Sequence, residues 1–512
     1  MLFMNLTCLN FLCTVSLAVS KSSKLRYMKV FYVLIAIALY LLCACSKQNG
    51  YPESHPVIVF AIAQAPLNLD PRYATDAASE RVNRLLYQPL VDFDAQSKPM
   101  PALAHWQKIS PTQYRFILNE PHVRFHNGSE LTTVDVAATY QSFMQLKNSP
   151  HAAEFANIDH INVINPKLLD FYLKTPDSQF VAKLIIGILP AALIANGHDF
   201  SHTPIGSGAL KFISWQNTLL LERVADHQKI SLIEVKDPTV RVLKLLHGEV
   251  DLLQGDLPPE LVKHLQAQSE ITVQSSVGAN FSYLGLNMQD PVLKSLKVRQ
   301  AIAHAIDRNA IVQKVMVMKT RAAFAILPPE HYTNAGVDSL KSYDYNPALS
   351  RQLLKEAGVH LPLHLIYKTS TDPQRVRFAT IMQSQMQAAG IALEIRSLDW
   401  GTFFEDVKQG NFQLYGLTWV GIKTPEIYAK ALGSKSFPPN GFNRGRYVDG
   451  ELDSLLRKED WPAAIARIHE QLPYIPLWYE GQFAAMRKGL HNYSPKSDGN
   501  WDDLARISNY AH

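Results

Sequence analysis

The sequence predicts an α/β protein with two lobes or more, and three observations lead to this prediction. Segments rich in β-branched and aromatic residues alternate with segments of helical periodicity through most of the chain, which is the pattern of α/β folds. The chain has 512 residues, many more than one hydrophobic core normally organises. Hydrophobic residues make up 47% of it and charged residues 19%, which is a globular composition.

The chain opens with a segment that we interpret as a secretory signal. Basic residues precede an apolar run at residues 30–45, which is short for a membrane-spanning helix of about 20 residues. A positive flank, a short apolar core and small residues at its end are typical of export signals. A plain membrane anchor, or a signal that is cut elsewhere, is the alternative.

This run ends in the letters LCAC at residues 42–45 and resembles the bacterial lipoprotein box. The resemblance implies that Cys45 is lipidated and begins the mature protein. Residues 1–44 are then the signal region, in which Met28 is the more natural functional start. All four cysteines lie at or before Cys45, which leaves the mature chain without a disulfide framework or a cysteine-based metal site.

Residues 45–56 read as a polar, lipidated tether. The formal net charge of +5 includes the basic signal region and favours neither nucleic acid nor an acidic surface as a partner. We therefore expect a protein of the cell envelope, lipid-anchored on the periplasmic side. Ser46 directly follows the lipidated cysteine, and it favours the outer membrane if the host is Gram-negative.

The first predicted elements of the mature chain alternate between strands and helices. Residues 57–63 and 114–118 are rich in β-branched and aromatic side chains, as in strands. Residues 77–86 carry apolar side chains at helical spacing. Either Thr132 or Thr133 is suited to cap the helix that follows the second strand.

Residues 298–316 predict one long amphipathic helix, and strands again alternate with helices after it. The apolar face of that helix consists of Val298, Ile302, Ala305, Ile306 and Ile311. The later predicted strands are residues 361–368, 391–398 and 412–420, and the later helices are residues 346–357 and 375–389.

Seven segments, in order, resemble family 5 of the bacterial extracellular solute-binding proteins, the peptide- and nickel-type receptors of ATP-binding-cassette importers. The most recognisable is residues 114–143, a strand followed by Phe-His-Asn-Gly, Leu-Thr and an Asp-Val that begins a helix. The other six are LNLDPRYATDAASERVNRLLYQPLV, PIGSGALKF, LLHGEVDL, YLGLNMQDPVLKSLKVRQAIAHAIDRNAIV, YNPALSRQLLKEAG and IPLWY. The resemblance as a whole covers about residues 57–508.

The resemblance implies a bilobed, type II periplasmic-binding-protein fold with an extra N-terminal subdomain. Domain I is expected at residues 57–282 plus 475–512, with the extra subdomain at about 88–190, and domain II at residues 283–474. Each lobe then has its own core, and the lobes can rotate as bodies.

The two chain crossings between the lobes, near residues 283–285 and 476–478, would form the hinge. A ligand that both lobes contact favours the closed state by its differential affinity for that state.

The resemblance also implies the ligand-binding residues. In the family, the segment that corresponds to YGLTWVGIKTPE places a Trp and neighbouring backbone groups on the ligand, and a Trp offers a large flat surface at low entropic cost. The alternative is that Trp419 belongs to the core. The residues implied are Trp419, Val420, Gly421, Ile422 and Lys423, with Tyr73, Ala74 and Thr75 from the first lobe.

One position departs from the family pattern. Peptide-binding members place an acidic residue three positions after the cleft Trp, where it pairs with the peptide's α-ammonium group. Ile422 occupies that position here, and Lys423 follows it. Because an unpaired ammonium group is costly in a closed cleft, we predict weak or no binding of unmodified di- and tripeptides. Ligands without a free α-amine there, anionic or neutral ones, should be preferred.

Two alternatives to this hypothesis stay open. Lys423 could point to solvent, as most lysines do. Alternatively, Glu426 or another acid from the first lobe could replace the missing Asp.

The function implied is that of the substrate-binding lipoprotein of an ATP-binding-cassette importer. It would capture a peptide or peptide-like solute and deliver it to permease and ATPase subunits, without a cofactor and, as we expect, as a monomer. One alternative is an envelope sensor of ligands. Another is a receptor for a non-peptide ligand, such as an opine, a nickel complex, haem or a sugar.

Enzyme and metal-site motifs are incomplete, so we predict neither catalysis nor a bound metal. His198 and His202 are four positions apart, but their Gly- and Pro-rich flanks predict a loop. Residues 469–473 (HEQLP) lack the second His of a zinc-protease helix. Residues 205–209 (IGSGA) do not form a nucleophile elbow; we expect a turn where two glycines let another backbone pass closely.

Replacement of Cys45 tests the lipoprotein interpretation. In Cys45→Ala no thiol is available for the lipid, so processing should change and the protein should be released from membranes. Globomycin should block the same processing step in the unaltered protein. Cys43→Ala is the control and should be processed and retained normally. If processing and membrane retention survive in Cys45→Ala, the interpretation is wrong.

Overall fold

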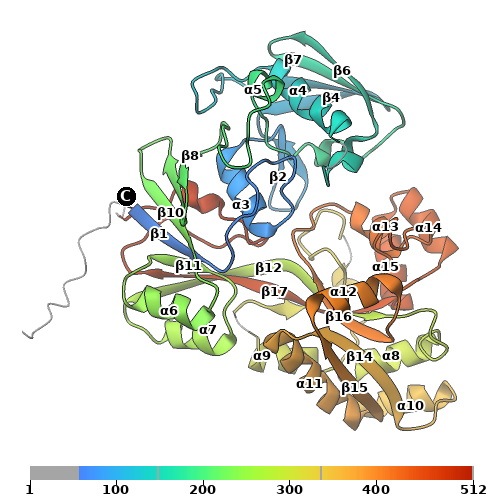
Figure 1. Ribbon diagram of the computed structural model, residues 1–512. Coiled ribbons are helices and arrows are strands. Elements are labelled where there is room, and N and C mark those ends of the chain that lie inside the picture. Colours follow the sequence, from blue (N-terminus) through green and yellow to red (C-terminus); the bar gives the residue numbers. More distant parts are fainter. Residues whose placement is uncertain (1–56, 147–148, 317, 335–336, 510–512) are drawn as a thin grey trace, which may run out of the picture. The chain divides into compact units, whose positions relative to one another are not determined.

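The computed structural model describes residues 57–146, 149–316, 318–334 and 337–509 (Figure 1). The signal region, the tether and Cys45 lie outside these residues, so what the sequence implies for them stays a prediction. The described residues belong to one compact unit. Among them, no helix is both long enough and apolar enough to cross a membrane.

Eleven strands of the described residues form one mixed sheet. They are β1 (Val57–Ile62), β8 (Leu210–Trp215), β9 (Thr218–Arg223), β10 (Lys229–Glu234), β11 (Leu252–Gln254), β12 (Ile271–Leu286), β13 (Arg321–Ala322), β14 (Leu363–Ser370), β15 (Ile391–Leu398), β16 (Leu414–Trp419) and β17 (Tyr474–Arg487). Their order is β15-β14-β16-β12-β17-β11-β1-β10-β9-β8, and β13 pairs with β17 beside this path.

The long strands β12 and β17 join the two halves of this sheet. They are antiparallel partners from Ile271 opposite Arg487 to Gly285 opposite Tyr474, and Figure 1 shows them side by side. β12 continues the sheet through β16, and β17 continues it through β11. The predicted crossings lie within this pair, since Tyr283 stands opposite Pro476.

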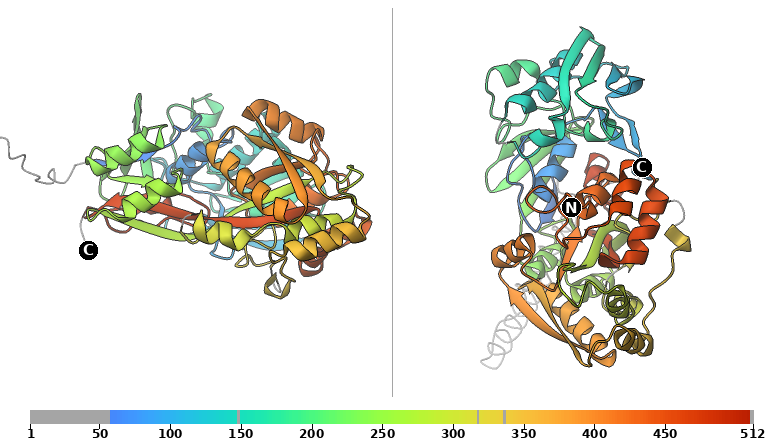
Figure 2. Two further views of the ribbon diagram at one scale, coloured as in Figure 1. Left: turned by 90° about the horizontal axis from the view of Figure 1, so that it is seen from below. Right: turned by 90° about the vertical axis from the view of Figure 1, so that its right-hand side faces the viewer.

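A smaller sheet has its own core. Its strands are β4 (Ala104–Ser110), β5 (Gln113–Leu118), β6 (Ile158–Asn165) and β7 (Leu168–Leu173), in the order β4-β5-β7-β6, and β2 (Val91–Phe93) pairs with β3 (Pro99–Pro101) nearby in the sequence. Phe116, Tyr140 and Phe171 are fully buried between this sheet and the helix that follows Thr132. Figure 1 and the right-hand view of Figure 2 both show the small sheet apart from the main one.

Polar residues directly before most of the helices cap them. Asp76 accepts a hydrogen bond from the backbone N–H of Ser79, and Thr132 forms a capping box with Asp135. The helices are α3 (Ala77–Leu86), α4 (Thr133–Gln145), α5 (Ala191–Ala195), α6 (Pro238–Leu246), α7 (Pro259–Gln266), α8 (Leu296–His304), α9 (Arg308–Lys314), α10 (Pro347–Glu356), α11 (Pro373–Ala388), α12 (Trp400–Gln409), α13 (Glu426–Leu432), α14 (Gly450–Arg457) and α15 (Trp461–Gln471). Short 3-10 turns are η2 (Ala152–Phe155), η3 (Val181–Lys183), η4 (Val337–Ser339) and η5 (Asp502–Ala505).

The prediction of one helix over residues 298–316 is wrong. The structure has α8 and α9 instead, and the side chain of Asp307 caps α9 by accepting from the backbone N–H of Ala310. This cap starts a second helix with a new axis, because an N-cap residue has non-helical backbone angles. The five apolar residues of the predicted face are nevertheless all buried.

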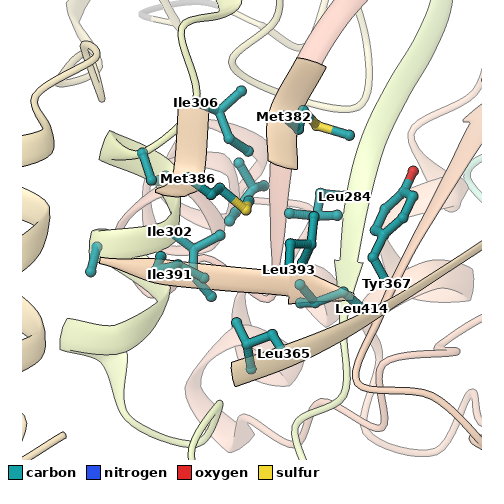
Figure 3. Close-up of a cluster of buried hydrophobic side chains, with 14 of the residues drawn as sticks. Leu284, Ile302, Ile306, Leu365, Tyr367, Met382, Met386, Ile391, Leu393 and Leu414 are labelled. Carbon is teal, nitrogen blue, oxygen red and sulfur yellow. The ribbon is translucent and has the colours of Figure 1, made fainter. Parts of the chain in front are cut away.

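The half of the main sheet with β14 and β15 is covered by α11. Figure 3 shows Met382 and Met386 of this helix in one buried cluster with Ile391 and Leu393 of β15. Leu365 of β14 belongs to the same buried cluster. The burial of this apolar surface holds the helix on the sheet.

The segment after β17 packs against the opposite half. The ring of Trp501 meets Phe60 of β1 edge to face at 5.0 Å. Asp502 of η5 accepts hydrogen bonds from the guanidinium of Arg84 on α3. The C-terminal segment therefore fixes α3 relative to β1.

Two glycines let α3 approach the chain before β8, as the letters IGSGA predict. A Cβ at Gly206 would lie 2.1 Å from the carbonyl oxygen of Leu86, and one at Gly208 would lie 2.2 Å from that of Leu85. No real Cβ atom is found so close to an oxygen. The backbone N–H of Gly208 instead donates to Leu86 O at 2.8 Å.

Gly208→Ala should therefore destabilise the protein by about 1–3 kcal/mol, the usual cost of overpacking. Urea unfolding measures this difference in the free energy of unfolding, with the same dependence on urea concentration assumed for the wild type and the variant. Gly450→Ala is the matched control, because no atom lies within 4 Å of a Cβ there. Equal stability of Gly208→Ala and the wild type would contradict the close approach.

Candidate ligand-binding site

A cavity of about 400 Å³ lies between α3 and the segment that follows β16. Glu80, Asn83 and Arg84 of α3 line one side. The loop after β16 and the residues Glu426 and Ile427 of α13 line another. This volume lies within the range of about 300–1,000 Å³ that is usual for small-molecule sites.

The structure brings half of the implied ligand-binding residues to this cavity. The lining residues among them are Ala74, Gly421, Ile422 and Lys423. The residues that do not line it are Tyr73, Thr75, Trp419 and Val420. Of these, Thr75 and Val420 are exposed to solvent.

Gly421 redirects the chain after β16. Its φ of +70° is in the left-handed region, where a glycine carries no steric cost. This turn separates Val420, which faces solvent, from Ile422 and Lys423, which line the cavity.

Trp419 lies one layer away from the cavity, in an aromatic cluster. Its ring is stacked on Tyr283 at 6.3 Å and contacts Phe442 at 5.6 Å. The guanidinium of Arg444 lies 4.7 Å from the ring centroid, in a cation–π contact. Phe442 lines the cavity, so it connects Trp419 with it.

Lys423 faces the cavity and forms an ion pair there. Its ammonium group lies 2.7 Å from a carboxylate oxygen of Asp498 and 5.5 Å from the ring centroid of Phe93. Burial alone would raise the pKa of Asp498, but the Lys423 ammonium, together with the backbone N–H of Asn500 and the charge of Arg84, outweighs this and lowers it. The positive charge on which the predicted repulsion of an α-amine depends is therefore balanced, and what remains of that hypothesis is the missing carboxylate at Ile422.

The other cationic side chains of the cavity are paired as well. Arg84 binds Asp92 and Asp502. Lys183 lies 2.8 Å from Asp177 and 3.0 Å from Glu426. Burial favours the neutral form of Lys183, yet these two carboxylates raise its pKa. A fourth cation, Lys430, lies 3.1 Å from Glu426.

Several cavity residues escaped the sequence analysis. Asn83 is a polar residue among the buried apolar positions Val82, Leu85 and Leu86 of α3, which is a signal that could have drawn attention to it and to Glu80 three positions before it. Asp498 has no such local signal, because it meets Lys423 only in the folded chain.

The two histidines at 198 and 202 lie in a loop, as predicted. His198 Nε2 lies 2.7 Å from the carbonyl oxygen of Thr203, and His202 Nδ1 lies 2.9 Å from Asp199. Among the described residues, no group of three or more His, Cys, Asp or Glu side chains could hold a metal ion.

Comparison with known proteins shows what this chain is similar to. The model of the bacterial extracellular solute-binding proteins, family 5 middle, matches residues 96–436. Di/tripeptide-binding protein 2 of Pseudomonas aeruginosa (strain UCBPP-PA14) is 28% identical over 518 residues, which cover 89% of this chain and 96% of that protein.

Solved structures share the fold. The ABC transporter substrate-binding protein CtaP of Listeria monocytogenes aligns with a TM-score of 0.79 at 21% identity, over 88% of this chain and 98% of that one. NikZ of Campylobacter jejuni, in complex with Ni(L-His), aligns with a TM-score of 0.73 at 22% identity, over 88% and 99%. These likenesses confirm the α/β, type II periplasmic-binding-protein fold that the sequence predicts.

Lys423→Met tests the ion pair in the cavity. At pH 7 the free energy of unfolding of the variant should be about 1–3 kcal/mol lower than that of the wild type, because Asp498 keeps its charge without its partner. A carboxyl group with a lowered folded pKa stabilises the protein above its unfolded pKa of about 3.9. This contribution is lost as the pH falls through the folded pKa. The difference in stability between the variant and the wild type should therefore become smaller in acid.

Thermal unfolding at pH 7 and at stepwise lower pH measures this difference. Lys435→Met is the control, since Lys435 is exposed and has no ion pair within the described residues. A pH-independent difference for Lys423→Met would contradict the assigned pair.

Proposed function

Since the chain belongs to the bacterial extracellular solute-binding proteins of family 5, we propose that it is the substrate-binding component of an ATP-binding-cassette importer. It captures a peptide or peptide-like solute and delivers it to the permease and ATPase subunits. It acts as a binding protein and not as an enzyme. The name of the P. aeruginosa relative, a di/tripeptide-binding protein, supports a small peptide as the solute.

The observation that carries this proposal is the cavity itself. Segments that lie far apart in the sequence line it, from Ala74 through Lys423 to Asn500. Its volume of about 400 Å³ suits a solute of two or three residues better than a long peptide. Its walls combine apolar side chains with nine Asp, Glu, Lys or Arg side chains, and polar groups that fix the orientation of a ligand are usual in specific sites.

Capture proceeds in this proposal by closure of two lobes. Domain I, residues 57–282 with 475–512, and domain II, residues 283–474, rotate about the pair of β12 and β17. Among the ion pairs that join the proposed lobes, two lie at the cavity, one between Lys423 and Asp498 and one between Lys183 and Glu426. The solute adds contacts on both sides and so shifts the population to the closed state.

We place the protein on the periplasmic side of the cell envelope, as a monomer held by a lipid on Cys45. The signal region and the lipoprotein box of the sequence support this placement. A tether at residues 45–56 would leave the lobes free to move and to meet the permease.

Calorimetry and native mass spectrometry test capture directly. Native mass spectra of the purified protein should show an added mass that is lost on unfolding. Free di- and tripeptides and their N-acetylated forms should then be titrated, with the intrinsic fluorescence of the protein recorded in parallel. Trp419→Phe should lose much of any fluorescence change, because Trp419 contacts the cavity residue Phe442. If no peptide in the panel binds, peptide capture is wrong.

Ile422→Asp tests the role of the loop after β16. The new carboxylate should bind an α-ammonium group and raise the affinity for free tripeptides about tenfold or more, as a charge-assisted hydrogen bond does. N-acetylated tripeptides should gain nothing, and Ile422→Asn is the uncharged control. An equal gain for free and acetylated peptides would contradict the proposed role of this position.

A further inference from the structure

In one corner of the cavity, two carboxylates have no lysine or arginine partner within the described residues. Each lysine or arginine that lines the cavity has a carboxylate partner within 3.1 Å. The carboxylate of Glu80 differs: no hydrogen bond or ion pair within the described part of the chain reaches it. Glu154 of η2 has only His151 near it, with Nδ1 at 3.9 Å, which is too long for a hydrogen bond.

His151 is itself held by another contact. Its Nε2 lies 2.7 Å from the carbonyl oxygen of Ala74 and therefore donates to it. Ala74 and His151 both line the cavity.

The surroundings of Glu80 disfavour the charged form of its carboxyl group. Glu80 is an exposed residue, yet partial desolvation beside the cavity raises the pKa of its carboxyl group, and Asp76 and Glu154 raise it further, whereas His151 and Arg81 lower it. Arg81 does not line the cavity; its guanidinium lies over the ring of Trp501, 5.4 Å from the centroid.

Asn83 is an independent sign that something binds in this corner. Its side chain is 7% exposed and lines the cavity, yet neither its amide nitrogen nor its amide oxygen has a hydrogen-bond partner. Buried amides are almost always hydrogen-bonded, because an unpaired one is destabilising. Asn83 follows Glu80 by three positions on α3, which places both on one helix face.

We propose that Glu80, Asn83 and Glu154 form a subsite for a cationic group of the solute, an ammonium or a guanidinium. The carboxylates balance its charge, and the amide oxygen of Asn83 accepts one of its N–H groups. The inference rests on the proposed function, because it specifies which solutes the cavity selects. The cation can be an α-amine or a basic side chain, since both present the same chemistry.

The first experiment uses trialanine peptides as probes. Each position is replaced in turn by lysine or by norleucine, which has a chain of similar length without the charge, and each peptide is made with a free and with an acetylated N-terminus. One charged member should bind at least tenfold more tightly than its uncharged counterpart. A preference for lysine over norleucine identifies a side-chain cation, and a preference for the free over the acetylated terminus identifies the α-amine.

Variants then assign this preference to the subsite. Glu80→Gln should reduce it at least tenfold, and Glu154→Gln should reduce it less. Glu405→Gln, at an exposed position on α12 outside the cavity, should leave it unchanged. Equal affinities for all charged and uncharged counterparts, or a preference that survives in Glu80→Gln, would overturn the proposal.

Asn83→Leu separates binding from folding. Leucine has a similar volume and no unpaired polar atoms, so the melting temperature should stay the same or rise while the charge preference falls. A lower melting temperature with unchanged preference would show that Asn83 serves the fold alone and would remove it from the subsite.

A failure of the proposed function remains distinguishable from a failure of this inference. If no tripeptide binds, peptide capture is wrong, and agmatine, which carries an ammonium and a guanidinium, becomes the probe. Saturation-transfer NMR should then show agmatine signals with the wild type that disappear with Glu80→Gln. Absence of a signal that depends on Glu80 would overturn the subsite.

Discussion

β12 and β17 are hydrogen-bonded to each other over most of their lengths, and both halves of the main sheet extend outward from this pair. One neighbour of the pair, β16, carries the loop that lines the cavity, and another, β11, leads to β1. In a strand, a slip of one residue would turn every side chain to the other face. The register of Tyr283 opposite Pro476 therefore decides where both walls of the cavity stand.

The walls combine charge with apolar surface in an ordered way. Lys183 and Lys423 are cations on opposite walls, and each is paired with a carboxylate of the other wall. Such pairs hold two surfaces together with little net charge, at the cost of desolvating both partners. Selectivity is then left to the groups without partners, which in this cavity are carboxylates and an amide.

Much of the fold could be predicted from local sequence. The helix at residues 77–86 and the strand at residues 391–398 were predicted with their observed bounds, because periodicity and end signals agree there. The break at Asp307 was missed because its apolar neighbours keep one face buried on both sides of it. A hydrophobic pattern reports burial, and it does not report the direction of the helix axis.

The site could be predicted only in part. The resemblance to a family led to Ala74 and to the loop with Lys423, both of which line the cavity. It did not lead to Asp498, because a contact between residues far apart in the sequence produces no recognisable pattern around either of them. The missing hydrogen-bond partners of the Asn83 amide could not be predicted either, since they depend on every group that surrounds this side chain in the folded protein.

The C-terminal segment has a consequence for the timing of synthesis. Asp498 and Asn500 are translated after every other residue that lines the cavity, and Asp502 and Trp501, which fix α3, follow them directly. A nascent chain thus has one wall incomplete while its first strands are already made. The cavity is therefore complete only once this segment has been made and has packed against α3.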